Sequence, residues 1–482
     1  MQNSYCQISI KSIFVILLFI CSSIKAENQW PNIPLLDIIT VDNIMPTATV
    51  IEAPEGCVGT SITENEYISG RMVMTLKGDT LYDSKEYVKS VSGMRIKIRG
   101  NSTGAYLTQH PYKIKLTKKD DLLRRNDKAF KHKEWLLLSM YTWNVKMTNQ
   151  ESNVLNIGGL LVSKAFNKEW TPSFDFVNVV LNGEYQGMYY LMESVDKGEK
   201  RVNISDTGFL IEHDPFWWNE NAYFKTNRQN SITAYTYKYP DDDEVTEDTQ
   251  NAIQDYMNRF EDALYNNTDN ISQYIDITSF AKWMLIHDIL GTDDAIGCNR
   301  FICKYDINDD SKLQMGPLWD YDSMFRSDDL STIHSWNLFY YPTLFERQDF
   351  IKVYVDLWME VKDHIKEYLQ QEFQSVKDKY GEVFDESIKL HQTKYPNEGK
   401  QAFNEQINEM EEKLNQRILF INHYVTSLNN EYSSIRSHII QPQGSSLYYN
   451  MNGQCIQPSK LHQGFYIKVN EKGTACKIAI DR

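Results

Sequence analysis

The pattern of apolar and polar residues divides the chain into a β-rich half and a helical half. Between Ile51 and Pro240, short runs alternate with a period of two and are separated by turn signals, which predicts strands. Asn182-Gly183 lies between two such runs and favours a tight hairpin turn. One helix, 149–166, is expected to interrupt this half. The predicted strands are Met94–Ile98, Tyr112–Leu116, Phe176–Leu181, Gly187–Met192, Phe209–Glu212 and Tyr235–Tyr239.

After Pro240 the apolar residues recur at helical spacing. Thr278–Leu290 is almost wholly apolar and stops at Gly291, a common residue at helix ends. Other amphipathic stripes lie in 253–264, 351–375 and 400–429. Strands followed by helices are the outline of a two-lobed α+β enzyme. We therefore expect an α+β fold with two lobes.

The last residues change character again. A polar linker, 431–446, precedes two short strand patterns around an Asn-Gly turn, Leu447–Gln454 and Gly464–Val469. We expect a small β appendage over 447–482. A bridge between Cys455 and Cys476 would suit a tail of this kind in an oxidising compartment.

The first 26 residues have the pattern of a secretory signal peptide. Lys11 precedes the apolar run Ile13–Cys21, and a short polar stretch ends at the small residue Ala26. We expect cleavage after Ala26 and export of the mature chain. Lipidation at Cys21 stays open, although the bulky Ile20 before it disfavours lipid-linked cleavage. Later windows are too short or too polar to span a bilayer, so we expect no transmembrane anchor.

Net charge and cysteine content exclude some classes of protein. The net charge of −15 becomes −17 when the leader takes Lys11 and Lys25 with it. A surface this acidic argues against nucleic acid as a partner, because cations supply most of that affinity. The mature chain has no C-x-x-C pair, so the sequence carries no zinc signal. Nothing in the sequence indicates an oligomeric state.

The segment 287–325 is the richest in residues that carry chemistry. Asp294 and Asn299 stand five apart in a loop between a helix and a strand, and Asp320 and Asp322 follow the next short strand. Phosphoryl transfer needs a carboxylate near the attacking hydroxyl and oxygen ligands for Mg²⁺. The Asp-x4-Asn spacing matches a protein-kinase catalytic loop. Ordinary loop capping by Asp and Asn is the alternative interpretation.

A second group of candidate residues lies in the β half. The turn beginning Arg99-Gly-Asn101-Ser102 could bring backbone N–H groups close to phosphates. Lys113 and Lys115 on the next strand could reach phosphate oxygens, and strand alternation puts both on one face. Either could instead belong to a solvated strand face. Glu193 ends a strand where the chain would leave one lobe for the other, and we expect that segment to contact a nucleotide base.

The order of these motifs resembles the spore coat protein H (CotH) kinase-like family, over about residues 35–430. The resemblance implies a divergent protein-kinase-like fold in a domain we place at 27–430. It also implies use of ATP and Mg²⁺ or Mn²⁺ to phosphorylate an exported protein. The matching motifs are R-G-N-S-T (99–103), P-Y-K-I-K (111–115), K-E-W-L-L-L (133–138), L-N-G-E-Y-Q-G-M-Y-Y-L-M-E (181–193), G-F-L-I-E (208–212), G-T-D-D (291–294) and G-P-L-W-D-Y-D (316–322).

Residue roles follow from the resemblance, motif by motif. Lys115 corresponds to the lysine that grips phosphate, with Lys113 as the second choice. Asp294 corresponds to the catalytic aspartate. Asn299 and one of Asp320 or Asp322 would be the metal ligands, and the sequence does not choose between the two aspartates.

The chain departs from the family pattern at three places. Gly104 stands where a Trp is common, Lys146 and Thr148 replace a typical Asp and Arg-Asn, and Arg326 stands where a Gly is usual. These changes favour an alternative, a weakly active or inactive kinase-fold surface protein that acts as a binding or adhesion scaffold. The intact aspartates favour the enzyme. The tail is similar to sorting domains of the type IX secretion system in Bacteroidetes, which implies a secreted or cell-surface protein.

Overall fold

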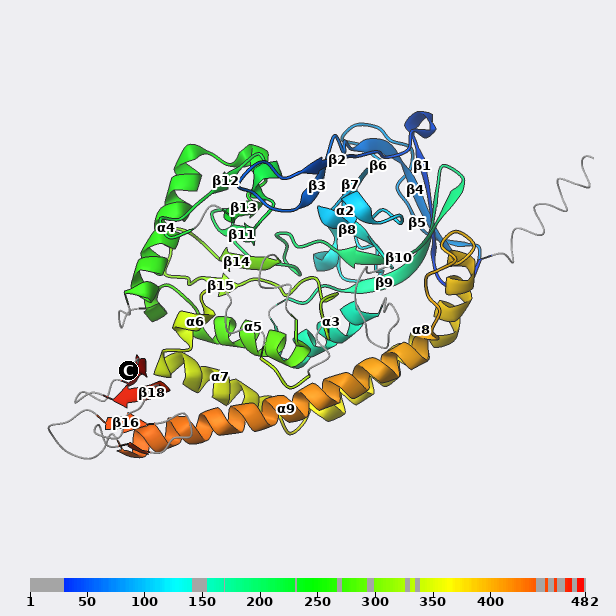
Figure 1. Cartoon of the computed structure of the whole chain (residues 1–482). Coiled ribbons are helices and arrows are strands. Elements are labelled where there is room, and N and C mark those ends of the chain that lie inside the picture. Colours follow the sequence, from blue (N-terminus) through cyan, green and yellow to red (C-terminus); the bar gives the residue numbers. More distant parts are fainter. Residues whose placement is uncertain are drawn as a thin grey trace, which may run out of the picture.

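Within the described residues, seven strands close into a barrel (Figure 1). The first strand closes it, because β1 pairs in parallel with β9 on one side and antiparallel with β4 on the other. A further strand, β5, extends the sheet beyond β4. In ring order the strands are β1 (Leu35–Thr40), β9 (Phe174–Leu181), β10 (Glu184–Glu193), β8 (His132–Ser139), β7 (Tyr112–Asp120), β6 (Met94–Ile98) and β4 (Ile68–Leu76), with β5 at Asp79–Asp83.

The computed structural model describes most of the chain. Asp294, Lys146, Thr148 and Arg326 lie outside the described residues, as do the predicted leader 1–26 and the segment 439–446. The described residues are 30–140, 154–168, 170–229, 232–266, 271–292, 299–325, 330–333, 339–438, 447–449, 455–456, 464–469 and 475–480.

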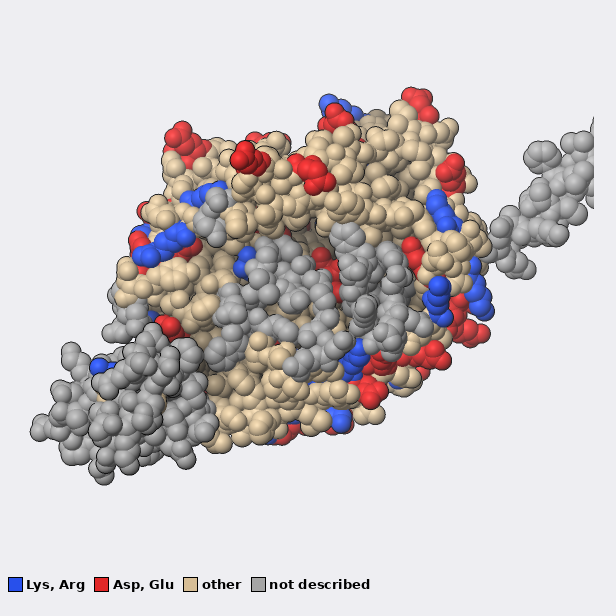
Figure 2. All heavy atoms as spheres, viewed as in Figure 1, with Lys and Arg blue, Asp and Glu red and all other residues tan. Residues whose placement is uncertain are grey.

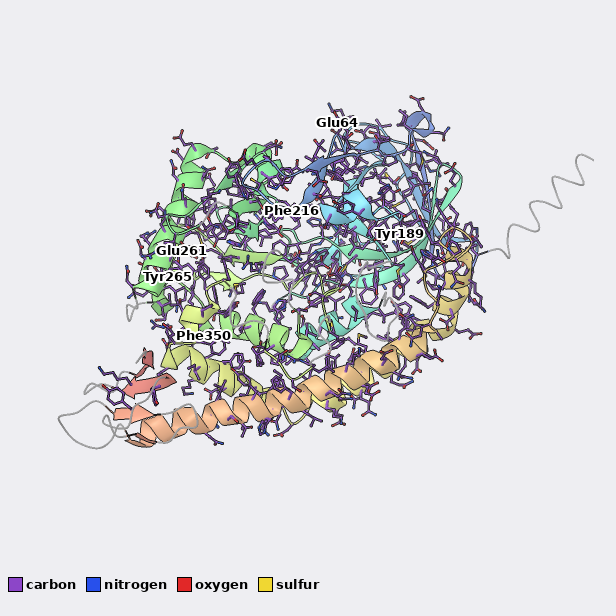
Figure 3. All side chains as sticks on the ribbon, in the orientation of Figure 1. Glu64, Tyr189, Phe216, Glu261, Tyr265 and Phe350 are labelled. Carbon is purple, nitrogen blue, oxygen red and sulfur yellow. The ribbon has the colours of Figure 1, made fainter. Side chains whose placement is uncertain are left out.

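Apolar side chains at alternate strand positions fill the barrel. Ile96, Ile114, Trp135 and Val179 come from four different strands and are all fully buried in one cluster. Tyr189, labelled in Figure 3, belongs to the same cluster. A barrel of this size is filled by its own side chains. The intervening polar residues of the same strands therefore face outward.

A second sheet stands beside the barrel. Its order is β12 (Tyr223–Phe224), β13 (Ala234–Tyr239), β11 (Phe209–Asp214), β14 (Arg300–Lys304) and β15 (Gln314–Met315). One face packs on helices, where the hydroxyl groups of Tyr235 and Tyr340 lie 2.6 Å apart. The other face is polar and carries Glu212 and Lys238, whose charged groups are 3.0 Å apart.

Helices cover the lower part of the molecule in Figure 1, where α9 runs along its whole edge. The almost wholly apolar α5 is buried nearly throughout its length, begins at the N-cap Asp276 and ends at Gly291 with a φ of 60°. No helix in the described part of the chain is long and apolar enough to cross a membrane. The longer helices are α3 (Leu155–Ala165), α4 (Glu247–Tyr265), α5 (Ile277–Leu290), α7 (Gln348–Val361), α8 (Ile365–His391) and α9 (Phe403–His438), and α6 is Tyr341–Leu344.

Most of the predicted elements are confirmed. All six predicted strands are present, and Asn182-Gly183 forms the turn between β9 and β10. The stripe in 351–375 is divided between α7 and α8. The predicted helix 400–429 is α9, which continues past residue 430 to His438.

The predicted two-lobed protein-kinase-like fold is wrong. The β-rich half is a closed barrel and not an open sheet, because β1 joins two strands that are far apart in the sequence. The two halves are also not separate lobes, because β14 and β15, which follow α5, return to the sheet of β11 and β13.

The tail forms a four-stranded sheet among its described residues, in the order β17 (Cys455–Ile456), β16 (Leu447–Tyr449), β18 (Gly464–Val469) and β19 (Ala475–Ile480). The predicted strands are present. Cys455 pairs with Tyr449 at one edge, and Cys476 pairs with Lys468 at the other. Three strand spacings separate the edges, roughly 14 Å. A disulfide needs Cα atoms within roughly 7 Å, so this strand order does not favour the bridge considered between them.

Candidate functional site

Two lysines on the outer face of the barrel share one carboxylate. Lys115 lies opposite Glu134 in the β7–β8 register, and its Nζ is 2.8 Å from Oε1 of Glu134. Lys113 forms an ion pair with Oε2 of the same residue. Burial acts to raise the pKa of Glu134, but the two lysines outweigh it and lower that pKa to about 2. Glu134 is therefore ionised and holds both ammonium groups on one face, as strand alternation predicts.

The positive face extends onto β6. Lys97 pairs with Lys113 in the β6–β7 register, and Arg95 pairs with Lys115. Both side chains contact Tyr67, since each cationic group lies 5.0 Å from the centroid of its ring. Burial and the neighbouring Lys113 lower the pKa of Lys97. Four cations thus lie together on this face with Glu134, and the charges of Glu66 and Glu220 also act on Lys97.

The turn after β6 carries Arg99 toward the second sheet. Gly100 has a φ of 89°, and the short helix α2 (Ser102–Tyr106) follows. Burial lowers the pKa of Arg99, whereas the charges of Asp320 and Glu212 act to raise it. These two carboxylates belong to the second sheet and to the loop after it. Arg99, on a turn of the barrel, is therefore close enough to Asp320 and Glu212 for their charges to act on it.

Asn101 and Ser102 have different surroundings in this turn. The side chain of Asn101 makes no capping bond to α2, and its Oδ1 accepts a 2.7 Å hydrogen bond from the hydroxyl of Ser61. Ser102 is the first residue of α2. The departure at Gly104 has a packing reason, because a Cβ there would lie 2.9 Å from Cδ1 of Ile62.

The polar face of the second sheet carries further charged side chains. Glu212 bonds to Lys238, and Thr236 donates a 3.3 Å hydrogen bond to Asp214. Burial and the charge of Glu212 raise the pKa of Asp214. Figure 2 shows a recess between the barrel and the second sheet on this face, with acidic side chains visible inside it.

The loop that bears Asp320 and Asp322 is fixed through the tyrosine between them. The buried Tyr321 hydroxyl lies 2.9 Å from that of Ser163 and donates to the carbonyl of Leu318 at 3.2 Å. Gly159 leaves room for the ring, because a Cβ there would lie 2.1 Å from it. Asp320 has a φ of 61° and, like Asp322, is partly exposed. Helix α3 thus sets the position of both carboxylates.

Asn299 and the Asp320 loop emerge at one edge of the second sheet. The strands β14 and β15 are antiparallel, and the amide of Gly316 donates to the carbonyl of Phe301 at 2.7 Å. The start of β14, after Asn299, therefore lies beside the end of β15. Asp294 itself is not described, but the loop that holds it begins at Thr292, whose hydroxyl bonds to Nδ1 of the buried His287.

Glu193 lies in a different environment from the lysine cluster. Its side chain is only 1 % exposed, with one oxygen 2.7 Å from Nη2 of Arg125 and the other accepting from the amide of Ser173 at 2.9 Å. Both carboxylate oxygens therefore have partners within the protein. The side chain joins β10 to the β7–β8 connection.

The oxygen atoms of Asn299, Asp320 and Asp322 are of the type that binds Mg²⁺ in nucleotide sites. Among the described residues, no three His, Cys, Asp or Glu side chains are grouped to hold a metal. Asp320, Asp322 and Asn299 nevertheless offer oxygen donors at one sheet edge. Mg²⁺ in nucleotide sites takes one or two carboxylates, and phosphate oxygens and water complete its shell.

Several residues of this face were missed from the sequence. Glu134 and Glu212 lie inside the K-E-W and G-F-L-I-E motifs, but one sequence does not show which strands are neighbours. Tyr67 and Lys97 carried no motif at all. Period-two alternation on β6 and β8 would have placed Lys97 and Glu134 outward, and it is the only signal that could have found them.

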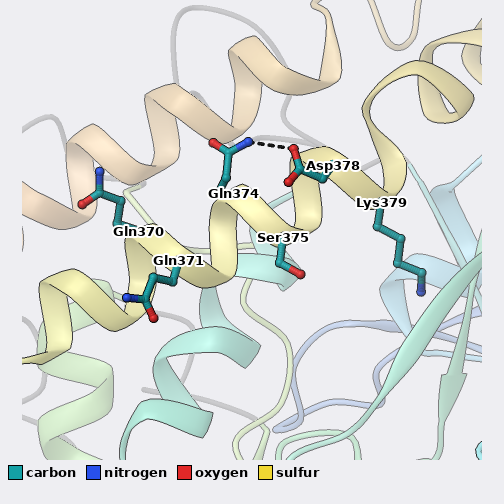
Figure 4. Close-up of a pocket in the computed structure, with 6 residues that line it drawn as sticks. All are labelled: Gln370, Gln371, Gln374, Ser375, Asp378 and Lys379. Atoms are coloured by element: carbon teal, nitrogen blue, oxygen red, sulfur yellow. Dashed lines mark hydrogen bonds between the residues drawn. The ribbon is translucent and has the colours of Figure 1, made fainter.

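A separate hollow of ≈ 730 Å³ lies along α8 (Figure 4). It is lined by Gln370, Gln371, Gln374, Ser375, Asp378 and Lys379. Gln374 donates a 2.8 Å hydrogen bond to Asp378. The main packing partners of α8 are α9, α3 and β10. The hollow is therefore not part of the lysine and aspartate arrangement.

These elements define a protein of mainly antiparallel sheets and helices, with a lysine cluster on its barrel and two aspartates on the loop after its second sheet. A family model described as CotH kinase protein matches residues 96–421, more than half of the chain. The chain belongs to this family, which confirms the resemblance seen in its motifs. No curated protein matches the chain. The match begins within β6, so β1 to β5 lie before it.

Proposed function

We propose that this protein is an atypical kinase that transfers the γ-phosphate of ATP to a hydroxyl group of an exported protein, with a divalent metal. Membership of the CotH kinase family supports the reaction class. The observation that carries the proposal is the pair of lysines, Lys113 and Lys115, that Glu134 holds on one face of the barrel. Arg99, on the turn after β6, is near enough to Asp320 for that charge to act to raise its pKa.

Each group has a role in this reaction. Lys115, Lys113 and Arg99 hold phosphate oxygens, and Glu134 keeps the two lysines in position. Asn299, Asp320 and Asp322 hold the metal, which when bound neutralises charge on the β- and γ-phosphates. Ser102 and Glu193 stay predictions as nucleotide contacts.

The chemical step needs one general base. The substrate oxygen forms a bond to the γ-phosphorus while the bond to the bridging oxygen breaks, and ADP leaves. Asp294 accepts the proton of the attacking hydroxyl. The described residues on either side of its segment are Thr292, whose hydroxyl bonds to Nδ1 of His287, and Asn299, which precedes β14.

The residue patterns of 1–26 and of 447–482 support a proposal for the place of action. We propose that the leader directs export and that the tail acts as a sorting signal, so the substrate is another exported or surface protein. We propose no nucleic-acid partner, because the net charge of −15 is acidic and cations supply most of the affinity for nucleic acid.

Thermal unfolding with ATP and Mg²⁺ or Mn²⁺ tests the proposal. A ligand at 100 times its Kd stabilises a protein by about 2.7 kcal/mol, so we expect the nucleotide and metal together to raise Tm measurably. Asp320→Asn or Asp322→Asn should remove the part of the Tm increase that depends on the metal. Asp310→Asn, on the exposed β14–β15 turn, is the matched control and should leave it. A stable protein that shows no nucleotide-dependent shift would support the scaffold alternative.

A further inference from the structure

A short hairpin lies against the Arg99 turn. It consists of β2 (Thr49–Glu52) and β3 (Thr60–Thr63), which pair only with each other. On the barrel side, the hydroxyl of Ser61 donates to Oδ1 of Asn101 at 2.7 Å, and the hydroxyl of Tyr106 donates to that of Thr60 at 2.5 Å. The hairpin therefore bonds to both ends of the segment 101–106.

The same hairpin bonds to the second sheet. Nδ2 of Asn219, in the 3-10 turn η3 (Trp217–Asn219) after β11, donates to the hydroxyl of Ser61 and to the carbonyl of Ile62, both at 2.9 Å. Nε1 of Trp218 donates to the carbonyl of Val58 at 3.1 Å. Phe216, labelled in Figure 3 between the two sheets, packs against Gly59, where a Cβ would lie 2.5 Å from its ring.

Ser61 is the residue that joins the two sides. Its side chain is fully buried, and its hydroxyl accepts from Asn219 while it donates to Asn101. A hydroxyl has one donor and two acceptor lone pairs, so this arrangement uses its donor and one acceptor. Loss of a bond between buried polar groups is costly when the groups find no other partner.

We infer that the β2–β3 hairpin is a clamp that holds the Arg99 turn against the second sheet, with Ser61 and Asn219 as positioning residues. Asn101 is two residues from Arg99, and η3 follows directly after the strand of Glu212. The chain Asn219–Ser61–Asn101 therefore ties the turn of Arg99 to the segment that follows the strand of Glu212. The hairpin lies before residue 96 and so outside the family match. The catalytic consequence rests on the proposed function, whereas the clamp itself does not.

Loss of the clamp should lower the rate of phosphate transfer, because phosphate contacts depend on the exact position of Arg99. A displacement of ~1 Å at a catalytic group, caused by a change away from the chemistry, can cost ~100-fold in rate. Asn219→Asp keeps the size of the side chain and removes both donors. It also offers the Ser61 hydroxyl a competing acceptor and sets a carboxylate against the Ile62 carbonyl. Asn221→Asp introduces the same charge at an exposed position nearby and is the matched control.

The first arm of the test measures amide hydrogen exchange of the full chain without nucleotide. In Asn219→Asp, amides of residues 101–107 should exchange about 10-fold faster, while the barrel strands β7 and β8 and the Asn221→Asp control stay at the wild-type rate. Ser61→Ala should reproduce the effect. Unchanged amide exchange at residues 101–107 would overturn the clamp, whether or not the protein binds ATP or transfers phosphate. A global rise in exchange would also overturn it, since the bonds would then serve only general stability.

The second arm is a double-mutant cycle on ATP affinity measured with Mg²⁺. Asn219→Asp should raise KM or Kd for ATP about 10-fold in the wild-type background and not in the Arg99→Ala background, because the loss acts through Arg99. Equal losses in both backgrounds would contradict the positioning role. A wild-type protein that binds no ATP would sink the proposed function, and the exchange arm would still decide for or against the clamp.

Discussion

Lys115 and Glu134 face each other across β7 and β8, with Nζ of the lysine 2.8 Å from Oε1 of the carboxylate. Lys113 uses the other oxygen of the same carboxylate. Burial acts to lower the pKa of Lys115, but its bond to Glu134 outweighs this and raises it. The lysine is therefore charged at neutral pH and held in one orientation, as a phosphate contact requires.

Lys115→Ala is expected to weaken ATP binding by about 10-fold or more, since a hydrogen bond to a charged group contributes roughly 1.5–3 kcal/mol. Lys113→Ala is expected to do less, a ranking that comes from the family motif and not from the geometry. Isothermal titration with ATP and Mg²⁺ measures both. Lys119→Ala, exposed on the same strand, is the control. Equal losses from Lys113 and Lys115 would instead indicate one shared basic surface.

Glu134 makes stability depend on acid pH in a defined window. Its pKa is about 2 in the folded protein against 4.5 in the unfolded chain. Its contribution is therefore present above pH 4.5 and is lost as the pH falls toward 2. The shift corresponds to something on the order of 3 kcal/mol. Urea unfolding between pH 5 and pH 3 should show a smaller loss of stability in Glu134→Gln than in the wild type. Parallel losses would mean that the carboxylate is not held by the lysines.

Gly159→Ala should displace the Asp320 loop. The new methyl group would lie 2.1 Å from the ring of Tyr321, so the ring must move and its bond to Ser163 is lost. We expect a destabilisation of roughly 1–3 kcal/mol and a lower metal-dependent affinity for ATP. Gly158→Ala is the neighbouring control, since it meets the flexible side chain of Met410. A Gly159→Ala protein with wild-type stability and affinity would show that α3 does not position the loop.

Truncation to the family-matched segment 96–421 should prevent folding. It removes β1 and β4, which leaves β9 and β6 as open edges and exposes interior residues such as Val179. We expect an aggregating fragment that binds a hydrophobic dye, whereas residues 30–438 should unfold cooperatively. A cooperative, soluble 96–421 fragment would contradict the role of β1 in closing the barrel.

Local structure could be predicted from the sequence, and the arrangement of its elements could not. Alternation in Met94–Ile98 and Tyr112–Leu116 predicted two strands, and it put Lys113 and Lys115 of the second on one face, because burial of one strand face leaves a period-two pattern. Barrel closure depends on β1, Leu35–Thr40, which pairs with residues near position 178. No local pattern encodes a pairing over that separation, and the protein-kinase analogy supplied the wrong topology instead.

The candidate site shows the same division. The motifs singled out Lys113, Lys115 and Arg99. The two lysines share Glu134, and the charge of Asp320 acts on Arg99, but the roles of these residues stay predictions. The motifs gave no sign of Glu134 as the shared partner of the lysines, nor of Ser61 and Asn219, which lie in segments without any motif. These residues act through pairings between distant parts of the chain.

Transfer of labelled γ-phosphate from ATP to an exported protein, compared between the wild type and Asp294→Asn, tests the central claim most directly. A general base contributes about 10²–10⁴-fold, so transfer by Asp294→Asn should fall by that order while ATP and Mg²⁺ still bind. Loss in Asp293→Asn instead would move the role by one residue. Transfer that survives Asp294→Asn, Asp320→Asn and Asp322→Asn alike would contradict the account, because the reaction would then take place elsewhere on the molecule.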